Sequence, residues 1–152
     1  MKYVMETDKK KTARATSVNT PISPRDALEI VRTVKGMKLD NAKDYLESVI
    51  NKKSAVPYRK FLDSVSHKRG VGPGRYPVRA AKFILETLTN AENNAEFKQL
   101  DSEKLVIKSA VAQPAPPIKY YTYKAFGSSG KFYRERVHIQ IILEELEAEE
   151  SQ

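Results

Sequence analysis

The segment 113–136, QPAPPIKYYTYKAFGSSGKFYRER, constrains the fold of this chain more than any other. It carries aromatic and basic side chains, three prolines and a Gly-Ser-Ser-Gly turn, but no aliphatic pattern that could attach it to a core. The flanking segments 105–112 and 137–143 have the composition and alternation of β-strands. We therefore expect a β-hairpin arm over 113–133 that projects from the body by on the order of 30–40 Å, at about 3.3 Å per residue.

The first two-thirds of the chain predict three helices. Ser23 is a candidate N-cap before Pro24, and Gly36 ends this first helix. A second helix is expected to begin at Asp40 as its cap and to pair antiparallel with the first, because the connection between them is short. A long third helix follows Pro77, with an apolar stripe that continues to Ala95.

These elements predict an α+β fold, with three helices packed on a small antiparallel sheet and a long protruding β-hairpin. The β-branched residues before position 20 allow one further short strand. We expect a single domain, 1–152, because the length is that of about one domain. Its parts are expected to be a flexible N-terminus, a globular body, the hairpin arm and an acidic tail, at 1–12, 13–112 with 134–145, 113–133 and 146–152.

The charge distribution indicates a polyanionic partner. The net charge is +8, yet the last ten residues hold five Glu and no basic residue. Removing these five negative charges leaves +13 on the rest of the chain, which repels itself unless a polyanion neutralises it. Nucleic acid is the first candidate and an anionic membrane surface is the second. No segment of roughly 20 apolar residues and no signal-peptide pattern occurs, so we expect a cytoplasmic protein without a membrane partner.

The irregular segment 51–76 and the start of the third helix concentrate positive charge. Residues 52–82 contain nine Lys or Arg and a single acid, Asp63. A loop of this length in a small domain is usually functional or disordered. Its Gly70–Gly74 run is expected to form a flexible turn that holds an RNA phosphate rather than a nucleotide site, because the P-loop lysine is absent.

Catalysis and metal binding have little support in the sequence. The chain has no cysteine, and its two histidines, His67 and His138, have no suitably spaced carboxylates for a zinc site. No nucleophile-elbow motif supports a Ser-His-Asp triad. We expect no enzymatic activity, no catalytic residue, no metal and no cofactor.

The aromatic and basic side chains of the arm indicate RNA contact, because rings stack on exposed bases while cations neutralise phosphates. An ordinary strand with cross-strand aromatic pairs is the alternative, but an aliphatic partner face is missing. With the basic residues of the body, the candidate RNA-binding residues are Arg14, Arg25, Lys38, Lys52, Lys53, Arg59, Lys60, His67, Lys68, Arg69, Arg75, Arg79, Lys82, Lys119, Tyr120, Tyr121, Tyr123, Lys124, Phe126, Lys131, Arg134 and Arg136.

Four short stretches resemble the universal large-subunit ribosomal protein 22 family, called protein 17 in eukaryotes. The stretches are Ile22-Ser23-Pro24-Arg25, Val34-Lys35-Gly36-Met37-Lys38, Gly74-Arg75-Tyr76-Pro77-Val78-Arg79-Ala80-Ala81 and Leu88-Thr89-Asn90-Ala91-Glu92-Asn93-Asn94-Ala95. The resemblance extends from about Ala13 to Glu145, and the loop at 51–76 resembles the archaeal and eukaryotic branch.

The resemblance implies a structural protein of the large ribosomal subunit that binds and organises ribosomal RNA. It also implies that the hairpin threads through this RNA and lines the nascent-peptide exit tunnel near ribosomal protein 4, where the nascent polypeptide passes its tip. The family's arm is usually arginine-rich before its Tyr-Lys/Arg-Ala segment, whereas residues 118–122 here are Ile-Lys-Tyr-Tyr-Thr. This difference suggests more base stacking or a differently lined tunnel wall.

Two other functions stay open on the sequence alone. The first is a stand-alone regulator that binds RNA or DNA, which would show the same salt-sensitive binding. The second is an enzyme acting on an acidic substrate, for which activity would depend on His67 or His138.

Overall fold

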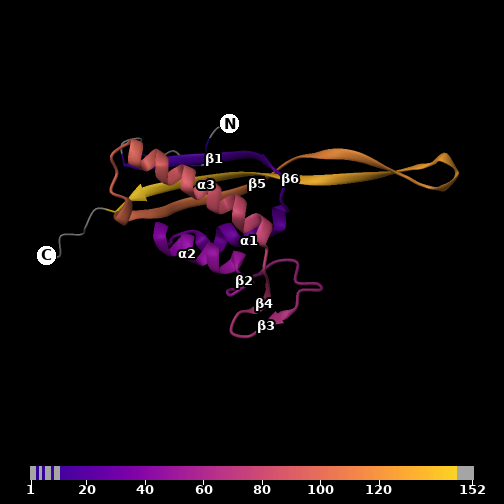
Figure 1. Ribbon diagram of the computed structural model, residues 1–152, viewed down its shortest axis with the longest axis horizontal. Helices are drawn as coiled ribbons and strands as arrows, with labels where there is room; N and C mark the ends of the chain where they lie inside the picture. Colours follow the sequence, from indigo (N-terminus) through magenta and orange to yellow (C-terminus); the bar gives the residue numbers. More distant parts are fainter. Residues whose placement is uncertain (1–2, 4, 6–7, 9–10, 147–152) are drawn as a thin grey trace.

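The computed structural model describes residues 3, 5, 8 and 11–146. Most of the predicted flexible N-terminus and of the acidic tail therefore lies outside the described residues. The architecture is α+β, with three helices and two small antiparallel sheets, as the sequence predicted (Figure 1). No helix within the described ranges is both long and apolar enough to cross a lipid bilayer.

The main sheet has three antiparallel strands in the order β1-β6-β5. Strand β1 is Thr12–Thr20, β5 is Leu105–Tyr123 and β6 is Ser129–Glu145. The side chains of β6 that the sequence placed on one face, Val137, Ile139, Ile141 and Leu143, are all buried. This confirms the predicted strands at 105–112, at 137–143 and before position 20.

Three helices cover one side of this sheet. Helix α1 is Pro24–Val34, α2 is Leu39–Ile50 and α3 is Val78–Phe97 (Figure 1). Ser23 is the N-cap of α1, as predicted, although its side chain makes no capping hydrogen bond. The predicted cap of α2 is wrong by two residues, because the N-cap is Lys38 and Asp40 lies in the first turn. Helix α3 runs through the core and buries most of its predicted apolar stripe.

The expected antiparallel pair of α1 and α2 is wrong. Helix α1 packs mainly on β5, and α2 packs mainly on α3. The connection between them binds the sheet instead, because the Gly36 amide donates to the Ile107 carbonyl and the Ile107 amide donates to the Met37 carbonyl. Gly36 takes a φ of +86°, which glycine adopts without strain.

The basic segment 51–76, predicted as irregular, contains a second small sheet whose strands are connected by turns and irregular stretches. Short strands β2 (Val56–Pro57), β4 (Gly72–Arg75) and β3 (His67–Lys68) pair antiparallel in that order. The predicted phosphate-holding turn does not form over the whole Gly70–Gly74 run, since its last three residues lie in β4. The Gly74 amide is occupied by a hydrogen bond to the Ser66 carbonyl.

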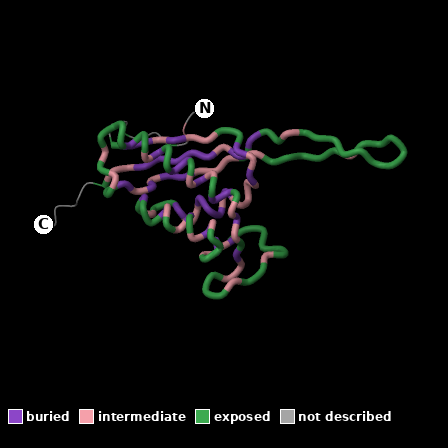
Figure 2. The backbone as a smooth tube through the Cα atoms, in the orientation of Figure 1, coloured by how far each residue is buried: buried purple, intermediate pink, exposed green. Residues whose placement is uncertain are grey.

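The hairpin arm is the continuation of β5 and β6 beyond the body. The ladder extends to Tyr123 opposite Ser129, with register shifts between Ile107 and Ser109 and between Ala115 and Ile118, and most residues beyond Ala115 are exposed (Figure 2). The turn comes earlier than predicted: a 3₁₀ turn over Ala125–Gly127 reverses the chain, closed by a hydrogen bond from the Lys124 amide to the Ser128 carbonyl. Two of the four residues of the Gly-Ser-Ser-Gly segment therefore belong to β6.

Candidate nucleic-acid interface

One face of the arm alternates lysine and tyrosine across its two strands. Lys119 lies opposite Tyr133, and Tyr121 lies opposite Lys131. Side chains of directly paired residues point to the same side of a ladder, and residues two apart share a face. Tyr123 continues this face toward the turn. We call these five residues the lysine–tyrosine face.

The rings of this face have little to contact within the chain. Tyr121 is 61% exposed and Tyr123 is 92% exposed, and Phe126 at the turn is fully exposed. Exposed tyrosine and phenylalanine rings flanked by lysines provide stacking surfaces and phosphate-binding cations within a few ångströms of each other. The arrangement is therefore suited to a single-stranded or distorted nucleic acid.

The opposite face of the arm is different, because its cation is already in contact with a ring. Arg134 lies over the ring of Tyr120, with its guanidinium carbon 5.4 Å from the ring centroid. Tyr120 in turn pairs with Phe132 across the ladder. This cation–π contact holds the guanidinium over the ring on this face of the arm.

Arg136 at the root of the arm is engaged by the backbone. Its Nε and Nη2 both donate to the Pro116 carbonyl, at 3.0 and 2.8 Å. The ladder slips between Ala115 and Ile118, so this carbonyl is at an irregularity where regular pairing is interrupted. The predicted RNA-binding residue Arg136 thus uses two of its donors to fix the geometry of the arm.

Two further predicted RNA-binding arginines, Arg25 and Arg75, lie over one buried tyrosine. Their guanidinium carbons are 5.5 and 5.8 Å from the centroid of the Tyr58 ring. Arg25 also donates to the Phe61 carbonyl, and Arg75 donates to the Ser64 carbonyl at 3.2 Å. These arginines connect the loop after β2 to the body.

The Tyr58 side chain is itself tied to α1. Its hydroxyl donates to Asp26 Oδ1 at 2.5 Å. Burial, and next this hydrogen bond, raise the pKa of the Tyr58 hydroxyl above its ordinary value. One turn further along α1, the buried Glu29 accepts a hydrogen bond from the Lys60 amide at 3.1 Å. Two acidic residues of α1 thus hold the start of the basic loop.

The remaining candidates spread over the small sheet and the neighbouring helices. Lys68 lies 5.4 Å from the centroid of the Tyr76 ring, beside a shallow depression that Lys52 and Arg75 also line. Arg14 in β1 lies over the ring of Tyr3. The other body candidates are exposed, and they are Lys38, Lys52, Lys53, Arg59, Lys60, His67, Arg69, Arg79 and Lys82.

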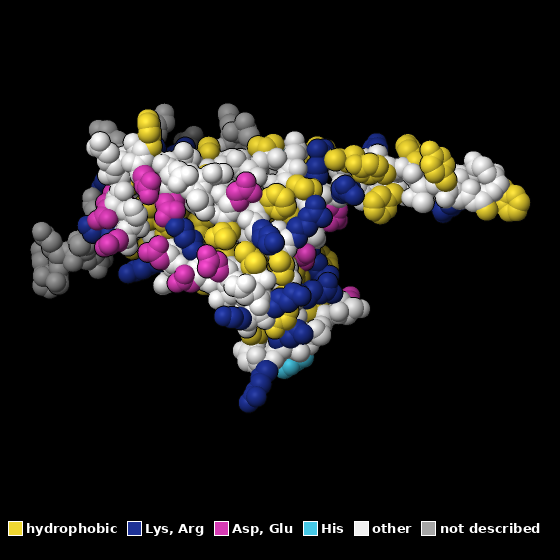
Figure 3. All heavy atoms as spheres, in the orientation of Figure 1, with side chains coloured by type: hydrophobic (Ala, Val, Ile, Leu, Met, Phe, Trp, Pro, Cys, Tyr) yellow, Lys and Arg dark blue, Asp and Glu magenta, His cyan; other side chains and the backbone are white. Residues whose placement is uncertain are grey.

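Figure 3 shows how charge is segregated on one side of the molecule. Lys and Arg gather near the root of the arm and on the part formed by the small sheet, while Asp and Glu gather over the opposite end of the body. The exposed acids of the helices include Asp44 and Glu47 of α2 and Glu96 of α3. A polyanion would be attracted to the arm and the small sheet and repelled by the far end of the helices.

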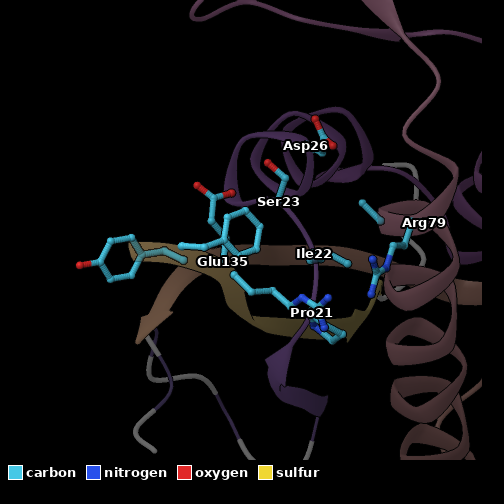
Figure 4. Close-up of a pocket in the computed structure, with 10 residues that line it drawn as sticks. Pro21, Ile22, Ser23, Asp26, Arg79 and Glu135 are labelled. Atoms are coloured by element: carbon cyan, nitrogen blue, oxygen red, sulfur yellow. The ribbon is translucent and has the colours of Figure 1, made fainter. Parts of the chain in front are cut away.

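A cleft of about 460 Å³ lies where the arm meets the body. It is lined by the segment before α1, by the first turns of α1 and α3, and by residues 132–135 of β6. In Figure 4, Arg79 borders it on the α3 side, Glu135 borders it on the arm side, and Ser23, the N-cap of α1, and Asp26 border it on the α1 side. No sequence pattern predicted this cleft. The one sequence feature that could have pointed to it is Glu135, the only acid in residues 113–136.

Comparison with known proteins decides the family. The model of the family described as ribosomal protein L22p/L17e matches residues 15–144 of the chain. The chain belongs to this family. Its match covers nearly the stretch from Ala13 to Glu145 over which the sequence resembled the family.

Archaeal relatives are similar over almost the whole L22p/L17e chain. A protein of Thermoplasma volcanium is 47% identical over 143 residues, covering 94% of this chain and 96% of its own. Proteins of Methanocaldococcus jannaschii and Ignicoccus hospitalis are 45% and 43% identical, and each comparison covers 94% or more of both chains. All three are named large ribosomal subunit protein uL22. These relatives support the placement of the chain in the archaeal branch of the family.

The histidines of this L22p/L17e chain do not form a catalytic or metal-binding cluster. His67 is exposed in β3, and His138 accepts a hydrogen bond from the Asn19 amide at its Nδ1, at 3.1 Å. Across the described part of the chain, no three His, Asp or Glu side chains are grouped as metal ligands. The chemistry that the arrangement offers is the binding of anions and the stacking of rings.

Proposed function

We propose that this chain is a structural, non-enzymatic constituent of the large ribosomal subunit, where it binds and organises large-subunit ribosomal RNA. The family membership and the names of the relatives support the ribosomal role. The observation that carries the RNA-binding part is the lysine–tyrosine face of the arm. Its cations and rings have few partners of their own chain, and a nucleic acid supplies both phosphates and bases to them.

The arm is the part that enters the RNA. In this proposal it threads between RNA segments, lines the nascent-peptide exit tunnel and lies near ribosomal protein 4, so that the nascent polypeptide passes its tip. The body, taken as 13–112 with 134–145, docks through the small sheet and the exposed basic residues of α3. The chain acts in the cytoplasmic ribosome, without a membrane partner.

Folding of the arm is coupled to assembly in this mechanism. An isolated two-stranded ribbon is marginally stable in water, and residues beyond Ala115 add few buried apolar contacts. The RNA supplies the missing surface, and neutralisation of charge and base stacking offset the loss of conformational entropy.

Co-sedimentation tests the ribosomal role against that of a stand-alone regulator of RNA or DNA. The tagged full-length chain should stay with large ribosomal subunits after a high-salt wash, because a threaded arm is held by its shape as well as by charge. Recovery of the washed chain only in the free fraction would contradict the proposal. Binding to isolated RNA should also weaken with salt, with log K falling by roughly 0.7–0.9 per phosphate neutralised for each tenfold increase in salt concentration.

A further inference from the structure

The cleft at the root of the arm combines three kinds of groups. Phe132 and Tyr133 are among its lining residues and are 54% and 49% exposed, with their rings on opposite faces of the arm. Arg79 and Arg134 line it with guanidinium groups. Glu135 adds a carboxylate from the arm, and Figure 4 shows that this carboxylate lies on the side of the cleft opposite Arg79. Its volume of about 460 Å³ falls in the range of roughly 300–1,000 Å³ that is typical of sites for small organic molecules.

Glu135 is difficult to explain as part of the fold. It is exposed, and none of the ion pairs within the described residues involves it, although Arg134 and Arg136 are its neighbours in sequence. Arg134 lies over Tyr120, and Arg136 donates to Pro116. A negative charge at this place weakens the attraction of the arm root for phosphates. It is therefore unfavourable for RNA binding unless the carboxylate itself accepts hydrogen bonds from a group of the RNA.

We propose that this cleft receives one unpaired RNA base and that the Glu135 carboxylate accepts hydrogen bonds from the N–H groups of that base. This inference rests on the proposed RNA-binding function. The ring of Phe132 offers the stacking surface, and Arg79 and Arg134 neutralise the phosphates on either side of the base. Protein side chains recognise RNA in this way when a base is extruded from its stack.

The carboxylate also determines which base fits. A carboxylate has two oxygens that accept hydrogen bonds side by side and no donor. Guanine presents an N1–H and an N2 amino group next to each other on its pairing edge, which matches both oxygens at once. Uracil offers one N–H there, and adenine and cytosine offer one amino group each beside a ring nitrogen that repels the carboxylate. The cleft should therefore prefer guanine.

The substitution Glu135→Gln distinguishes this proposal from simple repulsion of RNA by the Glu135 charge, because the two predict opposite changes in RNA affinity. If Glu135 only repels RNA, removing its charge strengthens binding to a polyanion. If it holds a base, the glutamine amide turns a donor toward the donors of guanine and binding weakens. The expected loss is about 5- to 100-fold, the range that one bidentate contact with a base contributes.

The test measures binding of the full chain to transcribed large-subunit ribosomal RNA of Thermoplasma volcanium, the source of a relative that is 47% identical. Glu47→Gln is the matched control, because Glu47 is exposed on α2, away from the cleft. The control should bind as tightly as the unchanged chain or slightly more tightly. Equal or tighter binding by Glu135→Gln would overturn the proposal.

A second measurement examines the cleft without the large RNA. The four nucleoside 5′-monophosphates are titrated into the chain while the amide NMR signals of Ser23 and Ala80 are followed. Guanosine monophosphate should shift them at the lowest concentration, and Glu135→Gln should remove this preference. Equal responses to all four nucleotides would overturn the base site. Failure of the unchanged chain to bind the ribosomal RNA would instead contradict the proposed function, which this titration does not depend on.

Discussion

The hydrogen bond between Tyr58 and Asp26 allows a quantitative test of how the basic loop is attached. Tyr58 is 3% exposed, and its hydroxyl donates to Asp26 Oδ1 at 2.5 Å. A hydrogen bond to a charged group contributes roughly 1.5–3 kcal/mol. Asp26 is partly exposed, so its carboxylate regains some hydration when the hydroxyl is removed. We therefore expect Tyr58→Phe to lower the free energy of unfolding by about 1–2 kcal/mol.

A second tyrosine provides a matched control. The Tyr45 hydroxyl in α2 is buried, and it has no hydrogen-bond partner in the described part of the chain. Tyr45→Phe removes the same atom without leaving a partner unsatisfied. Because an unsatisfied buried hydroxyl is itself unfavourable, we expect this change to be neutral within about 0.5 kcal/mol or to stabilise the protein.

Urea unfolding followed by circular dichroism measures both variants. The dependence of the free energy on urea should be unchanged, so that a shift in midpoint reports stability alone. A loss of 1 kcal/mol should also lower the melting temperature by about 2–4 °C. If the two variants behaved alike, or if Tyr58→Phe were neutral, the hydrogen bond would not fix the loop to α1.

Four other outcomes are expected. Burial, first, raises the pKa of the Tyr58 hydroxyl in the folded chain, so the hydroxyl stabilises the fold fully below about pH 10 and this stabilisation is lost as the pH rises further. In alkaline unfolding monitored by circular dichroism, the free energy of unfolding of Tyr58→Phe should therefore fall less steeply with pH than that of the unchanged chain. Arg136→Lys keeps the charge but loses the paired hydrogen bonds to Pro116, so distances between spin labels on arm and body should spread, whereas Arg134→Lys should leave them unchanged. Gly36→Ala places a Cβ at a φ of +86° and should lower stability by about 1–2 kcal/mol in chemical unfolding, whereas Gly130→Ala, which meets only the flexible end of Lys124, should have a smaller effect. Amide exchange in the free protein should be fast over 114–133 and slow in α3; uniform protection would contradict coupled folding of the arm.

Much of the fold could be predicted because the local sequence patterns point to the same residues as buried that the structure buries. The apolar stripe of α3, the buried face of β6 and the turn at Gly36 each follow from spacing or from one residue's conformational freedom. The separation of α1 from α2 could not be predicted in this way. It depends on the backbone of the connection binding Ile107, a residue about seventy positions away whose hydrogen bonds have no signature in the sequence.

The small sheet escaped prediction for a different reason. Strand β4 is Gly72–Arg75, of which three residues are glycine or proline, so it lacks the alternation by which strands are recognised. Its pairing is held by backbone hydrogen bonds, one of which runs from the Tyr58 amide to the Pro73 carbonyl at 2.9 Å. Composition alone shows only turn-forming residues here.

The candidate site was predicted as a set of basic and aromatic side chains, without the partners that these side chains have within the fold. Sequence identifies an arginine but not the acceptors that its donors have already found. Arg25, Arg75 and Arg136 each bind a backbone carbonyl of the chain, so part of their hydrogen-bonding capacity is used within the fold. The lysine–tyrosine face differs, because the register that sets lysine beside tyrosine could be known only after the position of the turn was fixed.

The register shift in the ladder at the root of the arm makes this the place where the arm bends most easily. Regular pairing resists bending, so the ribbon yields most readily between Ala115 and Ile118, where pairing is interrupted and two prolines lack amide donors. From there to the turn is roughly 25–30 Å at about 3.3 Å per residue, and a rotation of about 10° at the root therefore moves the far end by about 5 Å. The position of Phe126 in its surroundings is thus decided by Arg136, which lies at the opposite end of the arm.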